Sequence, residues 1–331
     1  MFWIKKESEN ATVTDYYLQI IGEALEQLND SVVYSYEWSE IQPGKGDTVV
    51  VCTAIGALRM YLKGVKYYFW AQGVWPEESN MRHHSNLRFR VCVIVEKFAL
   101  KNAEFVFMVS ETMKSYYEGK YKIDFSNRYL IMPCSNDEMH VNSFHEDYKY
   151  KNNVFCYAGG TSVWQCFEET IELYSKIERR VLNAKLLLLV REKRLALECL
   201  EKYGVKNYEI DFVTVDQLSV RLKGVKFGFV LRKESPVNYV ATPTKLLTYL
   251  SNGIIPIYSS SLAGVSGILK DTNYKIEYQN DGNIDQIIML SNEAPDGDSI
   301  LKEYMNVYSE KYDKKRHIQR IRESVGKYAY K

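Results

Sequence analysis

The sequence has 331 residues, of which 46% are apolar and 26% are charged, and its formal net charge is +1. These values exclude an intrinsically disordered chain and a protein that binds nucleic acid through a strongly basic overall charge. No run approaches the roughly 20 apolar residues that span a bilayer, so we expect a protein that is neither secreted nor integral to a membrane.

Strand-like and helical patterns alternate in the first half of the sequence. In chain order we predict a strand at 48–53, a helix at 54–62, strands at 65–70 and 105–109, and a helix from Glu111. Ser110 directly before Glu111 is typical of a helix N-cap. Alternation of this kind predicts a parallel sheet with crossover helices.

The alternation starts again after a polar stretch. The second half has predicted strands at 154–157, 184–190, 208–213, 225–231 and 254–258, with a long helix at 164–180. We therefore predict an α/β protein with two doubly wound, Rossmann-like domains. Their expected limits are 1–134 for the N-terminal domain, 135–152 for a linker, 153–299 for the C-terminal domain and 300–331 for a helical segment.

Six cysteines show no CxxC pair, and several lie within apolar runs: Cys52, Cys92, Cys134, Cys156, Cys166 and Cys199. We interpret them as reduced core thiols. Such thiols are typical of a reducing compartment, and we therefore expect a cytoplasmic protein.

The segment from Phe227 to Tyr258 carries the most informative chemistry. It is predicted to run strand, loop, helix, turn, strand, with Thr242 as the N-cap of the helix and Pro243 at its first position. Lys245 in the first turn opposes the helix dipole unless an anion compensates it, and Arg232 leaves the preceding strand on the same side. A diphosphate is such an anion, whereas two ordinary surface cations are the alternative interpretation.

The stretch SPVNYVATPTKLLTYLSNGIIPI, residues 235–257, resembles the donor-site signature of GT-B glycosyltransferases, especially family 4. In that family the loop and helix hold the diphosphate of a nucleotide-sugar. The resemblance makes donor-phosphate candidates of Arg232, Asn238, Thr242 and Lys245. It also implies two domains that face each other across a cleft.

A second stretch, VFCYAGGTSVWQ at residues 154–165, resembles the first strand and Gly-rich turn of the GT-B C-terminal domain. Backbone groups of Gly159, Gly160 and Thr161 are therefore expected to approach a phosphate or a sugar. A structural turn without a ligand is the alternative for these glycines.

A third stretch, AQGVWPEESNMRHHSNLRFR at residues 71–90, resembles the acceptor domain of bacterial capsule and O-antigen transferases. We expect Glu77 and Glu78 on a loop at a strand end, where a carboxylate could deprotonate an acceptor hydroxyl or hold a sugar hydroxyl. With Arg82 they form the predicted catalytic, acceptor-side group.

The resemblance implies no cofactor and no metal, because GT-B enzymes generally stabilise the leaving diphosphate with cations and helix dipoles. The pair His83 and His84 does not change this, since adjacent helical residues do not share a face. One departure concerns the two glutamates that retaining members of family 4 carry. Their positions hold Val240 and Thr248 here, so the ribose contact is either missing or supplied elsewhere, for example by Thr248, and the stereochemical course stays open.

The resemblance predicts a glycosyltransferase of bacterial surface-polysaccharide synthesis, with a nucleotide-sugar donor and a glycan acceptor that is usually lipid-linked. It also implies that the last helix crosses back to brace the N-terminal domain. The basic C-terminal end, from Lys311 to Lys331, is either a solvated helix face or a contact with the inner face of the cell membrane. A GT-B nucleotide-sugar epimerase and a non-catalytic GT-B scaffold are the two alternative functions.

Overall fold

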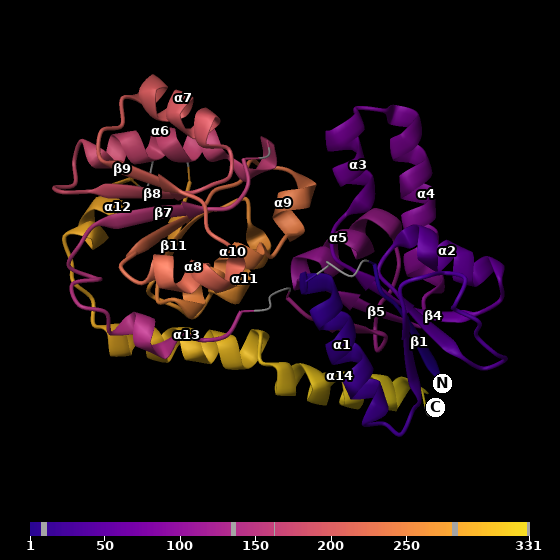
Figure 1. The fold of residues 1–331 in the computed structure, drawn as a ribbon. Coiled ribbons are helices and arrows are strands. Elements are labelled where there is room, and N and C mark those ends of the chain that lie inside the picture. Colours follow the sequence, from indigo (N-terminus) through magenta and orange to yellow (C-terminus); the bar gives the residue numbers. More distant parts are fainter. Residues whose placement is uncertain (8–11, 134–136, 162, 280–283, 330–331) are drawn as a thin grey trace. The chain divides into compact units, whose positions relative to one another are not determined.

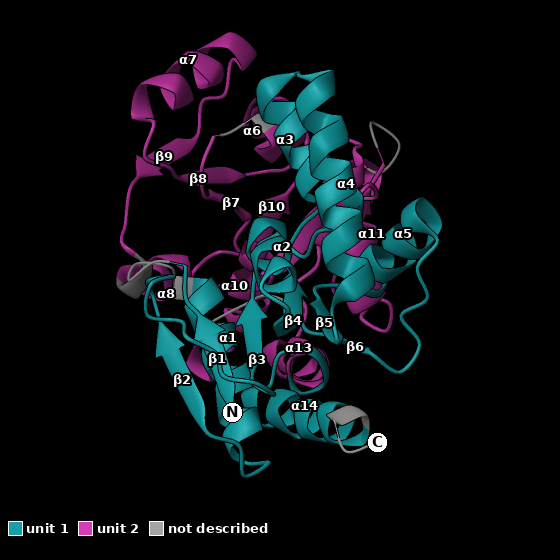
Figure 2. Cartoon of the chain, turned by 90° about the vertical axis from the view of Figure 1, so that its right-hand side faces the viewer, with its two compact units in different colours: residues 1–136, 239–242, 309–331 teal, residues 137–238, 243–308 magenta. Residues whose placement is uncertain are grey.

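The structure is a computed structural model that describes residues 1–7, 12–133, 137–161, 163–279 and 284–329 (Figure 1). The chain divides into two compact units (Figure 2). Unit 1 comprises residues 1–136, 239–242 and 309–331, and unit 2 comprises residues 137–238 and 243–308. Cys134, one of the expected core thiols, lies outside the described residues, whereas the other five cysteines are free.

Unit 1 is a parallel six-stranded sheet covered by helices. Its elements are β1 (Phe2–Lys5), α1 (Thr12–Glu26), β2 (Val32–Ser35), β3 (Thr48–Val51), α2 (Ala54–Leu62), β4 (Lys66–Ala71), α3 (Trp75–His83), α4 (Asn86–Asn102), β5 (Phe105–Met108), α5 (Glu111–Tyr121), β6 (Tyr129–Ile131) and α14 (Lys314–Ala329). The strand order is β2-β1-β3-β4-β5-β6. Every residue of β3 and β5 is buried, as expected for central strands with helices on both faces.

The last helix belongs to the core of unit 1. Ile321 and Val325 of α14 pack in one hydrophobic cluster with Tyr17 and Ile21 of α1 and with Trp70 of β4. Lys314 at the start of α14 forms a 2.8 Å ion pair with Glu23 of α1. The helix is therefore held on this unit by apolar burial, to which one exposed ion pair adds little.

Unit 2 repeats the architecture with a second parallel six-stranded sheet. Its elements are η1 (Val141–Phe144), β7 (Val154–Ala158), η2 (Val163–Gln165), α6 (Phe167–Glu178), β8 (Lys185–Leu189), α7 (Lys193–Tyr203), β9 (Tyr208–Asp211), α8 (Val215–Leu222), β10 (Phe227–Val230), α9 (Pro236–Val240), α10 (Thr244–Ser251), β11 (Ile255–Ser259), α11 (Ala263–Ile268), β12 (Ile276–Tyr278), α12 (Ile284–Ser291) and α13 (Gly297–Lys311). Its order is β12-β11-β10-β7-β8-β9, and the last residues of α9 and α13 fall within unit 1.

The two parallel sheets confirm the predicted fold class of two doubly wound, Rossmann-like domains. In unit 1 the order reverses between β1 and β3, and in unit 2 it reverses between β7 and β10. Ligands of such sheets bind beyond the carboxyl ends of the strands at this reversal. The loops after these four strands are therefore the places to look for a site.

Several local predictions need correction. The helix predicted over 164–180 begins at Phe167, after the short η2 turn. The segment predicted from residue 300 is two helices, α13 and α14. Residues 137–152, expected as a linker, lie against unit 2, where the buried Lys149 donates a 2.6 Å hydrogen bond to the Asn252 carbonyl. The prediction that Ser110 is the N-cap of α5 is confirmed, because the Ser110 hydroxyl accepts a hydrogen bond from the Met113 amide.

Candidate functional site

A buried lysine ammonium lies at the carboxyl edge of the unit 2 sheet. Lys245, in the first turn of α10, is half-buried as a residue, but its ammonium is shielded from solvent. The ammonium lies 4.2 Å from the centroid of the Tyr157 ring and has no hydrogen-bond partner among the described residues. A cation–π contact therefore compensates only part of the cost of its desolvation.

Arg232 follows β10 and lies beside this lysine. Its side chain is buried, and its guanidinium donates to the carbonyls of Leu231, at 2.8 Å, and Gln165, at 3.4 Å. The Arg232 backbone is fixed as well, since its amide donates to Ser259 Oγ and its carbonyl accepts from Ser261 Oγ. Hydrogen bonds on both backbone groups hold the arginine in one position.

The two cations have no anionic partner within the described part of the chain, where neither forms an ion pair. Burial, and then the charge of Arg232, hold the pKa of Lys245 well below its ordinary value. Burial also lowers the pKa of Arg232. Two uncompensated positive groups at a sheet reversal are suited to bind an anion with several oxygens, because an anion would remove the desolvation cost of both.

The glycine turn after β7 lies against the lysine. Gly159 has a φ of +135°, and a Cβ built on it would approach the Lys245 ammonium to 3.2 Å. Gly160 faces open space, and its carbonyl accepts a 2.5 Å hydrogen bond from the Tyr157 hydroxyl. Thr161 follows as a partly exposed residue. The backbone is therefore unobstructed at Gly160, next to the glycine that lies against Lys245.

Three other predicted donor residues have different surroundings. The buried Asn238 amide donates to the Lys233 carbonyl at 2.8 Å, so it holds the loop after β10. Thr242 is not the N-cap: Pro243 occupies that position, and the buried Thr242 hydroxyl has no partner among the described residues. Thr248 lies within α10, three residues beyond Lys245, which places it on the same helix face.

Unit 1 has a hollow of about 490 Å³ at the carboxyl edge of its own sheet. Glu7 follows β1, Thr53 follows β3 and Gln72 follows β4, and these residues line the hollow together with Trp75, Glu78 and Glu96. Thr53 also caps α2 by accepting from the Gly56 amide. The three carboxylates are the only charged groups in the described lining.

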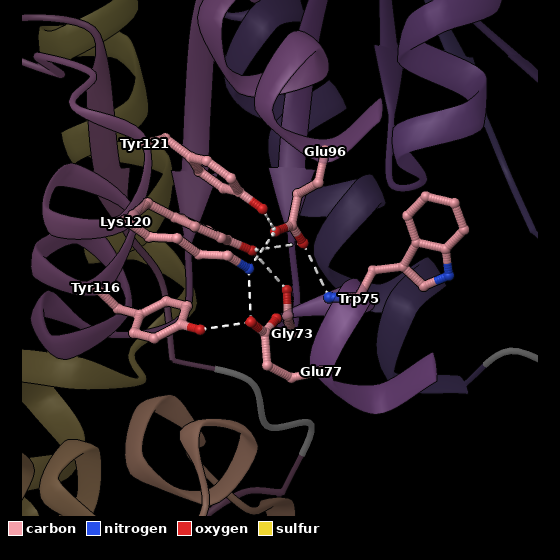
Figure 3. Close-up of polar contacts among 8 residues, drawn as sticks. Gly73, Trp75, Glu77, Glu96, Tyr116, Lys120 and Tyr121 are labelled. Carbon is pink, nitrogen blue, oxygen red and sulfur yellow. Dashed lines mark hydrogen bonds and ion pairs between the residues drawn. The ribbon is translucent and has the colours of Figure 1, made fainter. Parts of the chain in front are cut away.

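Glu96 of α4 lies at the centre of a buried polar cluster (Figure 3). One carboxylate oxygen accepts from the Trp75 amide at 2.9 Å and from the Tyr117 hydroxyl at 3.3 Å, and the other accepts from the Tyr121 hydroxyl at 2.6 Å. Burial raises the pKa of Glu96 to about 7, although the Tyr121 hydrogen bond and Lys120 act against this shift. The cluster ties α4 and α5 to the start of α3.

The adjacent glutamates Glu77 and Glu78 have separate roles in the structure. The prediction that they lie on a loop is wrong, because both belong to the first turn of α3. Glu77 accepts 2.6 Å hydrogen bonds from Tyr116 and Lys120, as Figure 3 shows, whereas Glu78 lines the hollow. Burial raises the pKa of Glu78, and Arg82, exposed one turn later, partly opposes this.

The Glu78 carboxylate lies close to the Gly73 backbone. It occupies the space where a side chain on Gly73 would begin, and the Gly73 carbonyl accepts from the Tyr117 hydroxyl at 2.7 Å. Sequence reasoning did not identify Gly73, Glu96 or the α5 tyrosines. A single glutamate within the apolar run from Val91 to Leu100 was the available signal, since an acid on a buried helix face requires partners.

Two further observations concern metals and membranes. Among the described residues, no group of three or more His, Cys, Asp or Glu side chains is arranged to hold a metal ion. No helix within the same residues is long and apolar enough to cross a membrane.

Neither protein-family models nor curated protein sequences match this chain. Solved structures do match its fold. Sucrose-phosphate synthase from Thermosynechococcus elongatus has a TM-score of 0.70 at 12% identity, with 97% of this chain and 96% of that chain covered. Anabaena HepE, solved with UDP and glucose, has a TM-score of 0.66 at 11% identity, with 98% of both chains covered.

Two more matching structures are the lipopolysaccharide outer core galactosyltransferase WaaB and TarM of S. aureus. WaaB has a TM-score of 0.64 at 13% identity, with 98% of both chains covered. TarM has a TM-score of 0.61 at 13% identity, and this chain spans 56% of its length. These neighbours are GT-B glycosyltransferases, and at such identities the likeness shows the fold alone: this chain has the GT-B fold.

Proposed function

We propose that this protein is a glycosyltransferase that moves a sugar from a nucleotide-sugar to a glycan hydroxyl. The main support for this proposal is the pair of Arg232 and Lys245, two buried cations without an anionic partner in the described part of the chain. They lie at the sheet reversal between β10 and β7, where a diphosphate would find both charges and the Gly159 backbone. The same cations would stabilise the leaving diphosphate, so the proposal requires no metal.

The nucleoside would lie along the same sheet edge. Phe212 follows β9 and Arg191 follows β8, and the Arg191 guanidinium lies 5.2 Å from the centroid of the half-exposed Phe212 ring. Strands β7, β8 and β9 are successive neighbours, so about 10 Å separates the Gly159 turn from Phe212. That spacing suits the distance from a diphosphate to a base, and we propose that the base stacks on this pair.

The acceptor would enter the hollow of unit 1. Glu78 lines it and has a raised pKa, which is suited to a group that takes a proton from a hydroxyl. Glu77 is a positioning residue, because Tyr116 and Lys120 occupy its carboxylate, and Arg82 tunes the pKa of Glu78. Three carboxylates without a cation in the described lining favour a neutral glycan end over a phosphorylated one.

The proposed classes of donor and acceptor rest on the solved structures that share this fold. HepE was solved with UDP, TarM with UDP and a GlcNAc-glycerol ligand, and WaaB is a lipopolysaccharide outer core galactosyltransferase. By analogy with these neighbours, we propose that the donor is a UDP-sugar. We also propose that the protein acts in surface-polysaccharide synthesis on a lipid-linked acceptor. The five described cysteines are free thiols, which supports placing the reaction in the cytoplasm.

Thermal melting tests the donor site first. The protein is melted with UDP, GDP, CMP, dTDP and ADP, each with and without a divalent metal ion. A ligand at 100 times its dissociation constant stabilises by about 2.7 kcal/mol, so selective, metal-independent stabilisation by one nucleotide is the expected result. Stabilisation by none would remove the donor assignment and leave the non-catalytic scaffold.

Product analysis then tests the reaction. The nucleotide-sugar of the selected base is incubated with an equimolar panel of neutral methyl glycosides, and the mixture is analysed by mass spectrometry. A glycosylated product that depends on Arg232 and Lys245 supports the transferase. Conversion of the donor sugar without an acceptor would instead identify an epimerase of the same fold.

A further inference from the structure

Gln165 places a buried amide oxygen beside Arg232. The residue ends the η2 turn, which follows β7 and the Gly159 turn, so it lies at the carboxyl edge of the unit 2 sheet. Its backbone carbonyl accepts the 3.4 Å hydrogen bond from the Arg232 guanidinium. Its side-chain Oε1 is shielded from solvent and has no hydrogen-bond partner among the described residues. Burying an acceptor without a donor costs free energy, so this oxygen is suited to a ligand that supplies the donor.

Two other buried amide oxygens of unit 2 also lack a partner among the described residues, but they lie elsewhere. Asn153 directly precedes β7, and Asn252 lies between α10 and β11, so both belong to the amino edge of the sheet. Ligands of a doubly wound sheet bind at the opposite, carboxyl edge. Of these three amides, Gln165 is therefore the one that a ligand at the sheet reversal would meet.

The backbone next to Gln165 is held in one conformation. Cys166, the following residue, has a φ of +50°, which is uncommon for a residue other than glycine. Its carbonyl accepts from the Thr170 amide at 3.0 Å and from the Thr170 hydroxyl at 2.7 Å, which anchors the turn to the first turn of α6. Because the backbone is fixed, the glutamine can contact a ligand without the cost of ordering a flexible loop.

A diphosphate does not satisfy the Gln165 oxygen. Phosphate oxygens accept hydrogen bonds, as the amide oxygen does, so Arg232 and Lys245 suit the diphosphate and this atom does not. Hydroxyl groups, in contrast, donate hydrogen bonds. The sugar of a nucleotide-sugar is bonded directly to the terminal phosphate, so its hydroxyls come within reach of a residue that contacts the arginine.

We propose that Gln165 recognises the donor sugar by accepting a hydrogen bond from one of its hydroxyls. The inference rests on the proposed function, because it takes the diphosphate to lie on Arg232 and Lys245. Gln165 is then a specificity-determining residue. A sugar that lacks this hydroxyl, or carries it in the inverted configuration, leaves the amide oxygen buried and unpaired, which is how polar sites discriminate strongly between similar substrates.

Titration calorimetry with UDP and with UDP-sugars tests the proposal. The probes are UDP-glucose, UDP-galactose and UDP-N-acetylglucosamine, and the variant is Gln165→Met, which nearly keeps the side-chain length and removes both hydrogen-bonding atoms. We expect the variant to bind UDP as the unchanged protein does. Its affinity for the UDP-sugar that the unchanged protein binds most tightly should fall roughly 5- to 150-fold.

Deoxyfluoro analogues of that UDP-sugar identify the hydroxyl. Fluorine in place of one hydroxyl removes the donor, so one analogue should bind the unchanged protein about as weakly as Gln165→Met binds the natural sugar. With that analogue the variant should show no additional loss, because the two changes remove the same hydrogen bond. A melting scan without ligand checks the fold, and the variant should be at least as stable as the unchanged protein.

The matched control is Gln286→Met. Gln286 is exposed beside Asp285, which pairs with Arg180 beyond the far end of α6, and the control should bind every probe normally. Unchanged affinity of Gln165→Met for all three UDP-sugars overturns the proposal. An equal loss for UDP and the UDP-sugars also overturns it, because the amide would then contact the diphosphate. If the unchanged protein binds neither UDP nor any UDP-sugar, the proposed UDP-sugar site fails, and this inference fails with it.

Discussion

The Lys245 ammonium lies over the Tyr157 ring, 4.2 Å from its centroid, and no described residue accepts a hydrogen bond from it. The ring is in turn held by its hydroxyl, which donates to the Gly160 carbonyl. One aromatic side chain therefore positions both the cation and the glycine turn. The arrangement is costly for the free protein and useful only when an anion is bound, since an anion supplies the missing partner.

Lys245→Met should stabilise the free protein and abolish donor binding. Removing an unpaired buried ammonium is expected to raise the free energy of unfolding by roughly 1–3 kcal/mol. Because the folded-state pKa lies below the ordinary 10.5, the unfolded chain binds more protons, and the cost of Lys245 diminishes as the pH rises toward that value. The increase in the free energy of unfolding caused by Lys245→Met should therefore be larger at neutral than at alkaline pH. Urea unfolding at both pH values measures it.

The matched control for this variant is Lys233→Met. Lys233 lies one residue beyond Arg232, is exposed, and pairs with Glu169 at 2.7 Å. Its loss should leave both stability and nucleotide affinity nearly unchanged, because exposed ion pairs contribute little. If both lysine variants lose nucleotide binding equally, general positive charge and not the buried site explains the affinity.

Phe212→Ala should weaken binding of a nucleoside diphosphate but not of pyrophosphate. Stacking of a base on an aromatic ring is worth about 1–3 kcal/mol, so affinity for the selected nucleotide should fall by roughly 5- to 150-fold. Titration calorimetry with both ligands separates the base from the diphosphate. The control is Tyr208→Ala, at the amino end of the same strand, where no ligand is expected.

Glu96 should make the stability of unit 1 fall as the pH rises. Its folded-state pKa of about 7 lies above the ordinary 4.5, so the folded protein binds more protons between these values. The stabilisation of the folded state by Glu96 is fully present below pH 4.5 and is lost as the pH rises through 7. The loss amounts to about 3 kcal/mol. Unfolding by urea at pH 5 and pH 8 should show this loss in the unchanged protein.

Glu96→Gln removes the titrating group and should reduce that pH dependence. Its amide oxygen can still accept from Tyr121, so the cluster is largely retained. The exposed Glu111 of α5 provides the control Glu111→Gln, which should keep the pH dependence of the unchanged protein. An identical pH profile for the Glu96 variant would mean that this carboxyl does not titrate with a raised pKa.

The sequence predicted the two sheets because their central strands are continuous apolar runs. The segments TVVV at β3 and FVFM at β5 are buried throughout, and such runs in alternation with helical patterns leave few other folds. Residues before β3 gave no such pattern. There β1, FWIK, ends in a lysine, and β2, VVYS, is an edge strand with one buried residue, so neither is a continuous apolar run.

The site was harder to predict because its chemistry depends on distant partners. Glu77 and Glu78 are adjacent residues of the same type, so the sequence does not distinguish their roles. The structure does, because Glu77 pairs with Lys120 whereas Glu78 lines the hollow. Glu96 lies 25 residues from its partner Tyr121. Lys245 was identified because its place in a first helical turn is itself unfavourable, which is a signal that the local sequence contains.

Gly73→Ala should lower sugar transfer without weakening donor binding. The added methyl group would take the space of the Glu78 carboxylate, which must then leave its position in the hollow. Because the carboxylate is the end of a flexible side chain, we expect a stability loss below about 1 kcal/mol but a fall in kcat of about 100-fold or more, the usual contribution of a positioned base. Gly119→Ala, where a Cβ would meet nothing, is the control and should transfer normally. Unchanged kcat in the Gly73 variant would remove Glu78 from the proposed mechanism.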